Sequence, residues 1–130
     1  MSSNLFIGLF MLFSMVASAQ KINVWRGGAP GHETDWSFFK NWSAGKVPSE
    51  FDHVIIPDVS TSTGKYPTIF AGEVEVMGLE IQSGASLTLL PGVRMQAEGI
   101  QLTGACKGCK SLVLIAEQRD TGRVTASYGQ

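Results

Sequence analysis

Short pairs of alternating apolar residues recur through residues 74–116, with turn-forming residues between them. Successive side chains of a β-strand point to opposite faces, so each pair places its two apolar side chains on one face. Glycine recurs in the turns, where it readily adopts the backbone angles that tight turns need. The segment therefore predicts a series of short strands that share one core. The side chains predicted to point into that core are Leu79, Ile81, Leu87, Leu89, Ile100, Leu102, Leu112 and Leu114.

The spacing of the turns favours a solenoid over a wide antiparallel sheet. Turns recur more closely than the roughly 8–12 residues that are usual in a sandwich or barrel. Such short strands can instead stack on the same strand of the next coil. The tetrapeptide at 78–81 recurs at 99–102, about one coil of a three-sided β-helix later, and 84–87 has a shorter echo at 92–95. We predict an all-β fold with a short parallel β-helix; an antiparallel β-sandwich is the alternative, because a meander could produce the same echoes.

Residues 1–19 form a predicted signal peptide. Residues 5–16 are almost wholly apolar, and Ala17-Ser18-Ala19 then supplies the small-x-small pattern that signal peptidase recognises. Gln20 is the first residue of the predicted mature chain. The apolar run is shorter than the about 20 residues that span a bilayer. An uncleaved membrane anchor is the alternative; with cleavage we expect a secreted protein with no membrane span.

The charge of the chain argues against a nucleic-acid partner. It has 10 basic and 11 acidic residues, for a formal net charge of −1, and they form no basic stripe of the kind that contacts phosphates. The chain after residue 19 is long enough for one small domain. We divide it into a cap region at 20–72, which is rich in aromatic residues, and β-helix coils at 73–130.

The two cysteines, Cys106 and Cys109, predict a disulfide. Export implies an oxidising compartment, where such pairs form and persist. The closed loop is very small, so its entropic stabilisation should fall well below the about 3 kcal/mol of a 15-residue loop. A zinc site would need about four ligands, and the two histidines, His32 and His53, are distant in sequence. Free thiols, a metal site and a redox pair are the alternatives; a redox pair usually precedes a helix, whereas strand-like residues follow at 111–115.

All three tryptophans, Trp25, Trp36 and Trp42, lie in the cap region. A solenoid must cover its first coil, because open strand edges and exposed apolar ends recruit other chains. We therefore interpret the tryptophans as the buried core of an N-terminal cap. The functional alternative is a sugar-binding platform, since an indole ring presents a flat apolar face with a polar edge. Phe38, Phe39 and Phe51 lie among or just after the tryptophans.

Short motifs follow one another in order through the chain after residue 19. They are Trp25-x-Gly27, Asp35-Trp36, Asn41-Trp42-x-x-Gly45-x-x-Pro48, Asp52-x-Val54-x-Ile56-Pro57, Tyr66-Pro67, and the segment from Val76 to Leu89. This series resembles the start of surface-exported repeat proteins of the Bacteroidetes. The resemblance implies a right-handed parallel β-helix at the front of a large secreted or cell-surface protein, often of adhesin type. It also implies type IX secretion, which reads a C-terminal sorting domain.

The charged residues form no recognisable catalytic set. Enzymes that cleave polysaccharides need clustered carboxylates, often with calcium, whose coordination takes about six oxygens. Glu73 and Glu75 share a strand face, where we expect both to be solvated, and no Gly-x-Ser-x-Gly motif occurs. We therefore expect no catalytic residue, metal or cofactor. Other candidates are Glu80, Arg94 and Glu98 in the coils, and His32, Glu33, Asp35, Asp52, His53 and Asp58 in the cap.

These observations predict a non-catalytic structural or adhesive module, secreted or exposed on the cell surface. A carbohydrate-active protein, polysaccharide-binding or lyase-like, is the alternative. The expected partners are a surface polysaccharide or a host or extracellular ligand. Nothing like the aromatic cap follows the strand predicted at 112–116, and residues 124–128 predict one more strand. We therefore expect the chain to be the front of a longer protein and to self-associate through its C-terminal edge.

Overall fold

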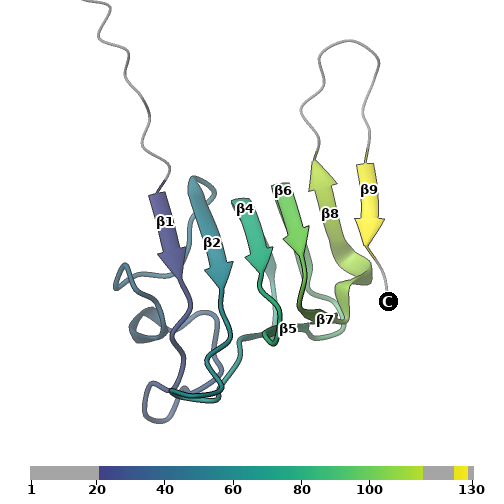
Figure 1. The fold of residues 1–130 in the computed structure, drawn as a ribbon. Coiled ribbons are helices and arrows are strands. Elements are labelled where there is room, and N and C mark those ends of the chain that lie inside the picture. Colours follow the sequence, from purple (N-terminus) through teal and green to yellow (C-terminus); the bar gives the residue numbers. More distant parts are fainter. Residues whose placement is uncertain (1–20, 116–124, 129–130) are drawn as a thin grey trace, which may run out of the picture.

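The computed structural model describes residues 21–115 and 125–128, so the predicted signal peptide lies outside the described residues. These residues form two β-sheets with almost no helix (Figure 1). The larger sheet has the order β1 (Lys21–Val24), β2 (Asp52–Ile56), β4 (Glu73–Ile81), β6 (Arg94–Leu102), β8 (Leu112–Ile115) and β9 (Thr125–Tyr128). The smaller sheet contains β3 (Thr68–Ile69), β5 (Ser86–Leu89) and β7 (Ala105–Lys107). Two short 3-10 helices are η1 (Phe39–Asn41) and η2 (Cys109–Ser111).

The strands of both sheets run parallel to their neighbours, with one exception. From β2 to β8 the chain alternates between the sheets, so each strand lies beside the strand two elements away in sequence. Among the described strands, only β8 and β9 pair antiparallel. The prediction of an all-β fold with parallel strands is confirmed. The alternative, an antiparallel sandwich, is not what these residues form.

The similar tetrapeptides at 78–81 and 99–102 are paired residue by residue in the larger sheet. Leu79 of β4 lies directly opposite Ile100 of β6, and the glycines and the last apolar residues of the two tetrapeptides are also partners. Side chains of the same kind therefore lie next to one another across the sheet. The shorter echo between 84–87 and 92–95 has no such counterpart, because Leu87 pairs with Cys106 in the smaller sheet while Met95 lies in the larger one.

The alternation of inward and outward side chains slips once in each of the two long strands. In β4, Val76 and Leu79 are both buried, with two residues between them instead of one. β6 repeats the slip at the matching positions. The two halves of these strands also take different neighbours, since β2 pairs with 78–81 and β8 pairs with 95–97. The slip keeps the apolar residues of both halves of each long strand inward.

All of the predicted inward residues except Leu114 contribute to one hydrophobic core. Burial of an apolar side chain of this size contributes about 1.5–3 kcal/mol relative to leaving it exposed, so these residues are a main source of stability. Leu79, Ile81, Leu87, Leu89 and Leu112 are buried, Ile100 and Leu102 are partly buried against the same cluster, and Leu114 is partly buried. Val54 and Ile56 of β2 join this core.

Close approach between successive segments requires glycine at several positions, including Gly78 and Gly108. At Gly108, which has a φ of 76°, an added Cβ would overlap the carbonyl oxygen of Leu89. At Gly78 an added Cβ would overlap the imidazole ring of His53, which lies across the outer face of β4. Gly99, the register partner of Gly78, would have nothing within 4 Å of its added Cβ. A methyl group would therefore be crowded at Gly78 but would fit freely at Gly99.

The last described strand folds back on the sheet. β9 pairs antiparallel with β8, and Leu112 lies opposite Tyr128. The strand predicted at 124–128 is therefore present, but it covers the edge of β8, and β1 and β9 lie at opposite ends of the larger sheet (Figure 1). Within the described chain, residues 99–102 of β6 and the strand β7 have no strand on their outer edges. No helix of the described residues is long and apolar enough to cross a membrane.

Candidate functional site

The three tryptophans lie at the centre of the cap. Trp25, Trp36 and Trp42 are 0%, 1% and 2% exposed. The Trp42 ring packs edge-on against the other two, with centroid distances of 5.1 Å to Trp25 and 4.7 Å to Trp36. The indole nitrogens of Trp25 and Trp42 donate hydrogen bonds to backbone carbonyls at 2.7 Å. This burial agrees with the interpretation as a cap core; because no indole face is accessible, a sugar has nothing to stack on at these positions.

A buried asparagine connects the loops of the cap. Asn41 is 0% exposed, and its Oδ1 accepts a hydrogen bond from the backbone N–H of Ala29 at 2.9 Å. Its Nδ2 donates to the backbone carbonyls of His32 at 2.6 Å and Asp35 at 2.9 Å. One side chain therefore satisfies three backbone groups in irregular loops, as buried polar groups require. Sequence analysis missed this role, and the only available signal was the position of Asn41 in the Asn-Trp motif.

The acids and histidines of the cap do not converge on one point. Three of them share a loop, where His32 Nδ1 lies 3.8 Å from Asp35 Oδ2 and Glu33 stands between these residues in the chain. The others lie apart: Asp52 is buried at the start of β2, His53 lies on the outer face of β2, and Asp58 belongs to the next loop. Among the described residues, no group of three or more His, Cys, Asp or Glu side chains could hold a metal ion.

Asp58 links two turns of the loop that follows β2. Its Oδ1 accepts hydrogen bonds from the Ser60 N–H at 2.9 Å and from the Tyr66 hydroxyl at 2.8 Å. The pKa of Asp58 is lowered from its ordinary value of 3.8, first by hydrogen bonds from Ser60 and then by the one from Tyr66. The pKa of Tyr66 is raised, first by desolvation and then by its hydrogen bond to Asp58. The two hydrogen bonds connect the turns of the loop and leave the carboxylate engaged with its own chain.

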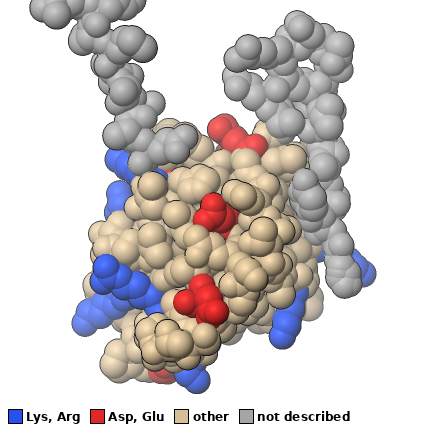
Figure 2. Space-filling model, in the orientation of Figure 1, with Lys and Arg blue, Asp and Glu red and all other residues tan. Residues whose placement is uncertain are grey.

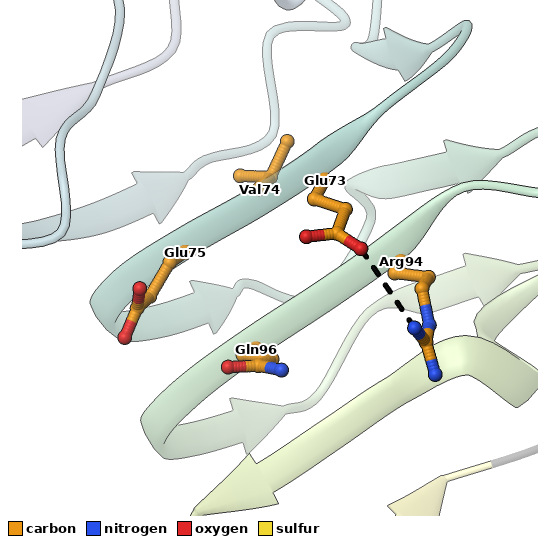
Figure 3. Close-up of a pocket in the computed structure, with 5 residues that line it drawn as sticks. All are labelled: Glu73, Val74, Glu75, Arg94 and Gln96. Carbon is orange, nitrogen blue, oxygen red and sulfur yellow. Dashed lines mark ion pairs between the residues drawn. The ribbon is translucent and has the colours of Figure 1, made fainter.

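Polar side chains line the outward face of β4 and β6 (Figure 3). Glu73 lies opposite Arg94 in the register, and Glu75 lies opposite Gln96. All four alternate with inward residues, so they project from one face of the sheet. Together with Val74 they border a shallow depression of about 240 Å³. The prediction that Glu73 and Glu75 are outward, solvated residues is confirmed.

This outward face is open to water. The Glu73 carboxylate lies 3.7 Å from the Arg94 guanidinium, and the two side chains are 77% and 75% exposed. An exposed pair of this kind contributes about 0–1 kcal/mol, and a general acid or base normally works in a more enclosed site. The face therefore presents carboxylate, amide and guanidinium groups to solvent.

Charge on the face of the molecule shown in Figure 2 is dispersed. Acidic side chains lie separately in the middle of this face, and basic side chains lie toward its margins. No continuous basic surface is present on this side. The even charge balance of the sequence is therefore also spread out in space on this face.

The two cysteines lie at disulfide-bonding distance. The Cα atoms of Cys106 and Cys109 are 5.8 Å apart, within the usual range of about 4.4–6.8 Å. Cys106 belongs to β7 and Cys109 begins η2, so the pair closes the turn that leads from β7 to β8. The predicted pairing of these two residues, a local clip between strands, agrees with this geometry.

Comparisons with known proteins do not identify a family for this chain. No protein-family model matches the chain, and neither a curated protein nor a solved structure matches it. The functional conclusion therefore depends on what the described residues can do.

Proposed function

We propose that the protein is a non-catalytic structural or adhesive module, secreted or exposed on the cell surface, and built as a right-handed parallel β-helix behind an aromatic cap. The observation that carries the proposal is the in-register repeat, in which Gly78 and Leu79 lie opposite Gly99 and Ile100. Folds of this kind grow by adding coils that bury one another, and they present extended surfaces to partners. Such a surface serves attachment or spacing without chemistry.

The path of the chain supports the β-helix. One circuit contains three short straight segments, 73–76, 78–81 and 86–89, with a corner or turn after each. Parallel pairing joins each segment to its equivalent in the next circuit. Three stacked parallel walls around an apolar interior are the arrangement expected of a three-sided solenoid.

The motifs shared with Bacteroidetes surface proteins have a physical role in this chain, which supports the resemblance. Trp25, Trp36 and Trp42 lie in the cap core, and Asn41 connects the cap loops. The cap covers the first coil, and the edges at 99–102 and β7, which have no neighbouring strand among the described residues, are suitable for a further coil. These features fit the front of a larger adhesin-like protein exported by type IX secretion.

Expression in a Bacteroidetes host that has type IX secretion tests the proposed location. The chain, joined to an epitope tag and to a sorting domain of that host, should be cleaved by protease added outside intact cells. A variant without residues 1–19 is the matched control and should stay protected inside the cells. A chain that also stays protected with residues 1–19 present would overturn the proposal.

The outward face of β4 and β6 favours a second candidate, a carbohydrate-active protein. Glu75, Arg94 and Gln96 could contact a uronic-acid polymer lying across the strands. A lyase would release an unsaturated product, which ultraviolet absorbance detects when polygalacturonate or alginate is the substrate. Unchanged absorbance would favour the non-catalytic module. An activity lost in Glu75→Gln but kept in Glu98→Gln, a matched exposed glutamate of β6, would favour the enzyme.

A further inference from the structure

Segments that are distant in sequence meet around a second depression, on the outside of the cap. The loop 31–35 forms one side, and Lys65 and Phe70, which flank β3, contribute to the other. The depression has a volume of about 420 Å³, within the about 300–1,000 Å³ typical of small-molecule sites. It shares no residue with the outward face of β4 and β6. We propose that it binds a neutral saccharide, an inference that rests on the proposed adhesive function and names its ligand class.

The loop is held in one conformation by hydrogen bonds to its backbone carbonyls. The carbonyls of His32 and Asp35 accept from Asn41, and the Thr34 carbonyl accepts from the Thr68 N–H at 2.7 Å. The Glu33 carbonyl accepts from the Gly28 N–H at 2.9 Å. A loop that is already ordered loses little conformational freedom when it binds a ligand, so a small ligand can bind measurably.

Two carboxylates on this loop are preorganised as acceptors. Glu33 Oε2 accepts from the Gly31 N–H at 3.0 Å, and Asp35 Oδ1 accepts from the Ser37 N–H at 2.8 Å. The other oxygen of Glu33 has no hydrogen-bond partner among the described residues, and the other oxygen of Asp35 has only the His32 ring, 3.8 Å away. Both remaining oxygens can accept from hydroxyl groups, and hydrogen bonds to a charged group are the stronger kind.

A donor and an aromatic ring complete the site. The Lys65 ammonium has no ion-pair partner within the part of the chain that is described, so it can donate to a ligand oxygen. Phe70 is 50% exposed, which leaves an apolar ring at the border of the depression. A phenyl face can pack against the C–H face of a pyranose. The His32 ring is held in place by stacking on Phe38, with centroids 3.9 Å apart and planes 7° apart.

The balance of these groups favours a neutral saccharide over other ligands. Two carboxylates against one ammonium disfavour an anion. A purely apolar ligand would bury charged groups without partners. A neutral sugar supplies hydroxyls for the charged groups and an apolar face for the ring. Because the depression is open, we expect a dissociation constant near 1 mM for a single sugar, with tighter binding when sugars are presented in clusters.

Nuclear magnetic resonance titration of the purified chain tests the site. The probes are the methyl glycosides of glucose, galactose and mannose, with sodium galacturonate as the anionic comparison. At least one neutral glycoside should shift the amide signals of residues 31–35 and Lys65. Glu33→Gln and Phe70→Ala should each weaken binding about tenfold or more. Matched controls are Glu98→Gln and Phe51→Ala, which change exposed residues outside the depression and should bind normally.

Three results would overturn the inference. They are no shift from any neutral glycoside at about 50 mM, well above the expected dissociation constant; binding that survives both site variants; and stronger binding of galacturonate than of the neutral sugars. The protease assay on intact cells separates this failure from failure of the proposed function. Surface exposure without sugar binding would rule out only the saccharide site. Absence of surface exposure would rule out the proposed function, whatever the chain binds.

Discussion

Replacing Asn41 with alanine should remove the central support of the cap. The side chain is fully buried and bonded to the N–H of Ala29 and to the carbonyls of His32 and Asp35. Alanine offers none of these partners. The Ala29 N–H would lose its hydrogen bond, whereas the carbonyls of His32 and Asp35 would each lose one of two, since they also accept from the N–H groups of Asp35 and Phe38.

The expected loss can be worked from the burial of each group. A buried donor or acceptor without a partner costs about 1–3 kcal/mol. The hydrogen bond to Ala29 is buried, whereas those to His32 and Asp35 are partly buried. Taking about 2 kcal/mol for the unpartnered Ala29 N–H and about 1 kcal/mol for the one hydrogen bond that each carbonyl loses, we expect a loss of about 4 kcal/mol. A small domain has a stability of about 5–15 kcal/mol, so this is a large fraction of it.

Urea unfolding followed by tryptophan fluorescence is the appropriate assay, because all three tryptophans lie in the cap. With an m value of about 2 kcal/mol/M, the midpoint should fall by roughly 2 M. Gln101→Ala is the control, since Gln101 is an exposed amide of β6. Its effect should stay within about 0.5 kcal/mol. A loss below about 1 kcal/mol for Asn41→Ala, with m unchanged, would refute the role of this side chain.

Asn41→Asp adds a pH test of the same contacts. The aspartate keeps the shape and one acceptor, but its second oxygen would face the carbonyls of His32 and Asp35. Burial and these carbonyls should raise the pKa of the introduced carboxyl, so the folded state binds a proton more tightly than the unfolded state. Stability of this variant should therefore rise as the pH falls toward about 4. A deficit independent of pH would contradict this account.

Three further predictions concern the rest of the fold. Gly78→Ala should cost about 1–2 kcal/mol because the new methyl group meets the neighbouring histidine ring, whereas Gly99→Ala should stay within about 0.5 kcal/mol; equal urea midpoints for the two variants would contradict the crowding. Hydrogen bonds lower the pKa of Asp58 in the folded state, so its contribution is present above about pH 4 and is lost as the pH falls through the folded pKa. Asp58→Asn should therefore flatten the acid side of a plot of urea midpoint against pH, and an unchanged slope would contradict the shift. Cys106 and Cys109 should not react with a thiol reagent in the oxidised protein, and reduction should cost less than about 3 kcal/mol; full labelling without reductant would exclude the disulfide.

The pairing of β4 with β6 could be predicted because similar residues that recur after one circuit of the chain become register partners in a parallel sheet. When side chains of the same kind recur after one circuit, in-register pairing places apolar residues beside apolar residues and glycine beside glycine. A one-residue shift would turn the apolar set outward. The echo at 84–87 and 92–95 lacked this meaning because it is shorter than a circuit, so its two copies belong to different sheets.

The interior of the cap could be predicted only in outline. The tryptophan cluster indicated a buried core, and its burial agrees with that. The loops depend instead on hydrogen bonds from one side chain, Asn41, to residues with no periodic spacing from it. No pattern of apolar residues encodes such contacts. The direction of β9 was also beyond the sequence, since strand-forming residues at 124–128 favour a strand without deciding how it pairs.

In the cap, the residues that maintain the fold differ from the residues proposed to contact a ligand. The motif residues Trp25, Trp36, Asn41 and Trp42 are buried, so the resemblance they carry concerns structure. Asp35 is also a motif residue, and one of its carboxylate oxygens accepts a hydrogen bond within its own loop.

The other groups of the proposed saccharide site lie outside these motifs. Glu33 and Lys65 are free to differ without loss of a core contact, and Phe70 is half exposed. A chain that kept the motifs and changed these three residues should keep the cap and bind a different ligand. Exchanging only these positions between two such chains should therefore transfer saccharide preference while the urea midpoint stays constant, and a change in stability without a change in preference would show that these residues support the cap rather than select its ligand.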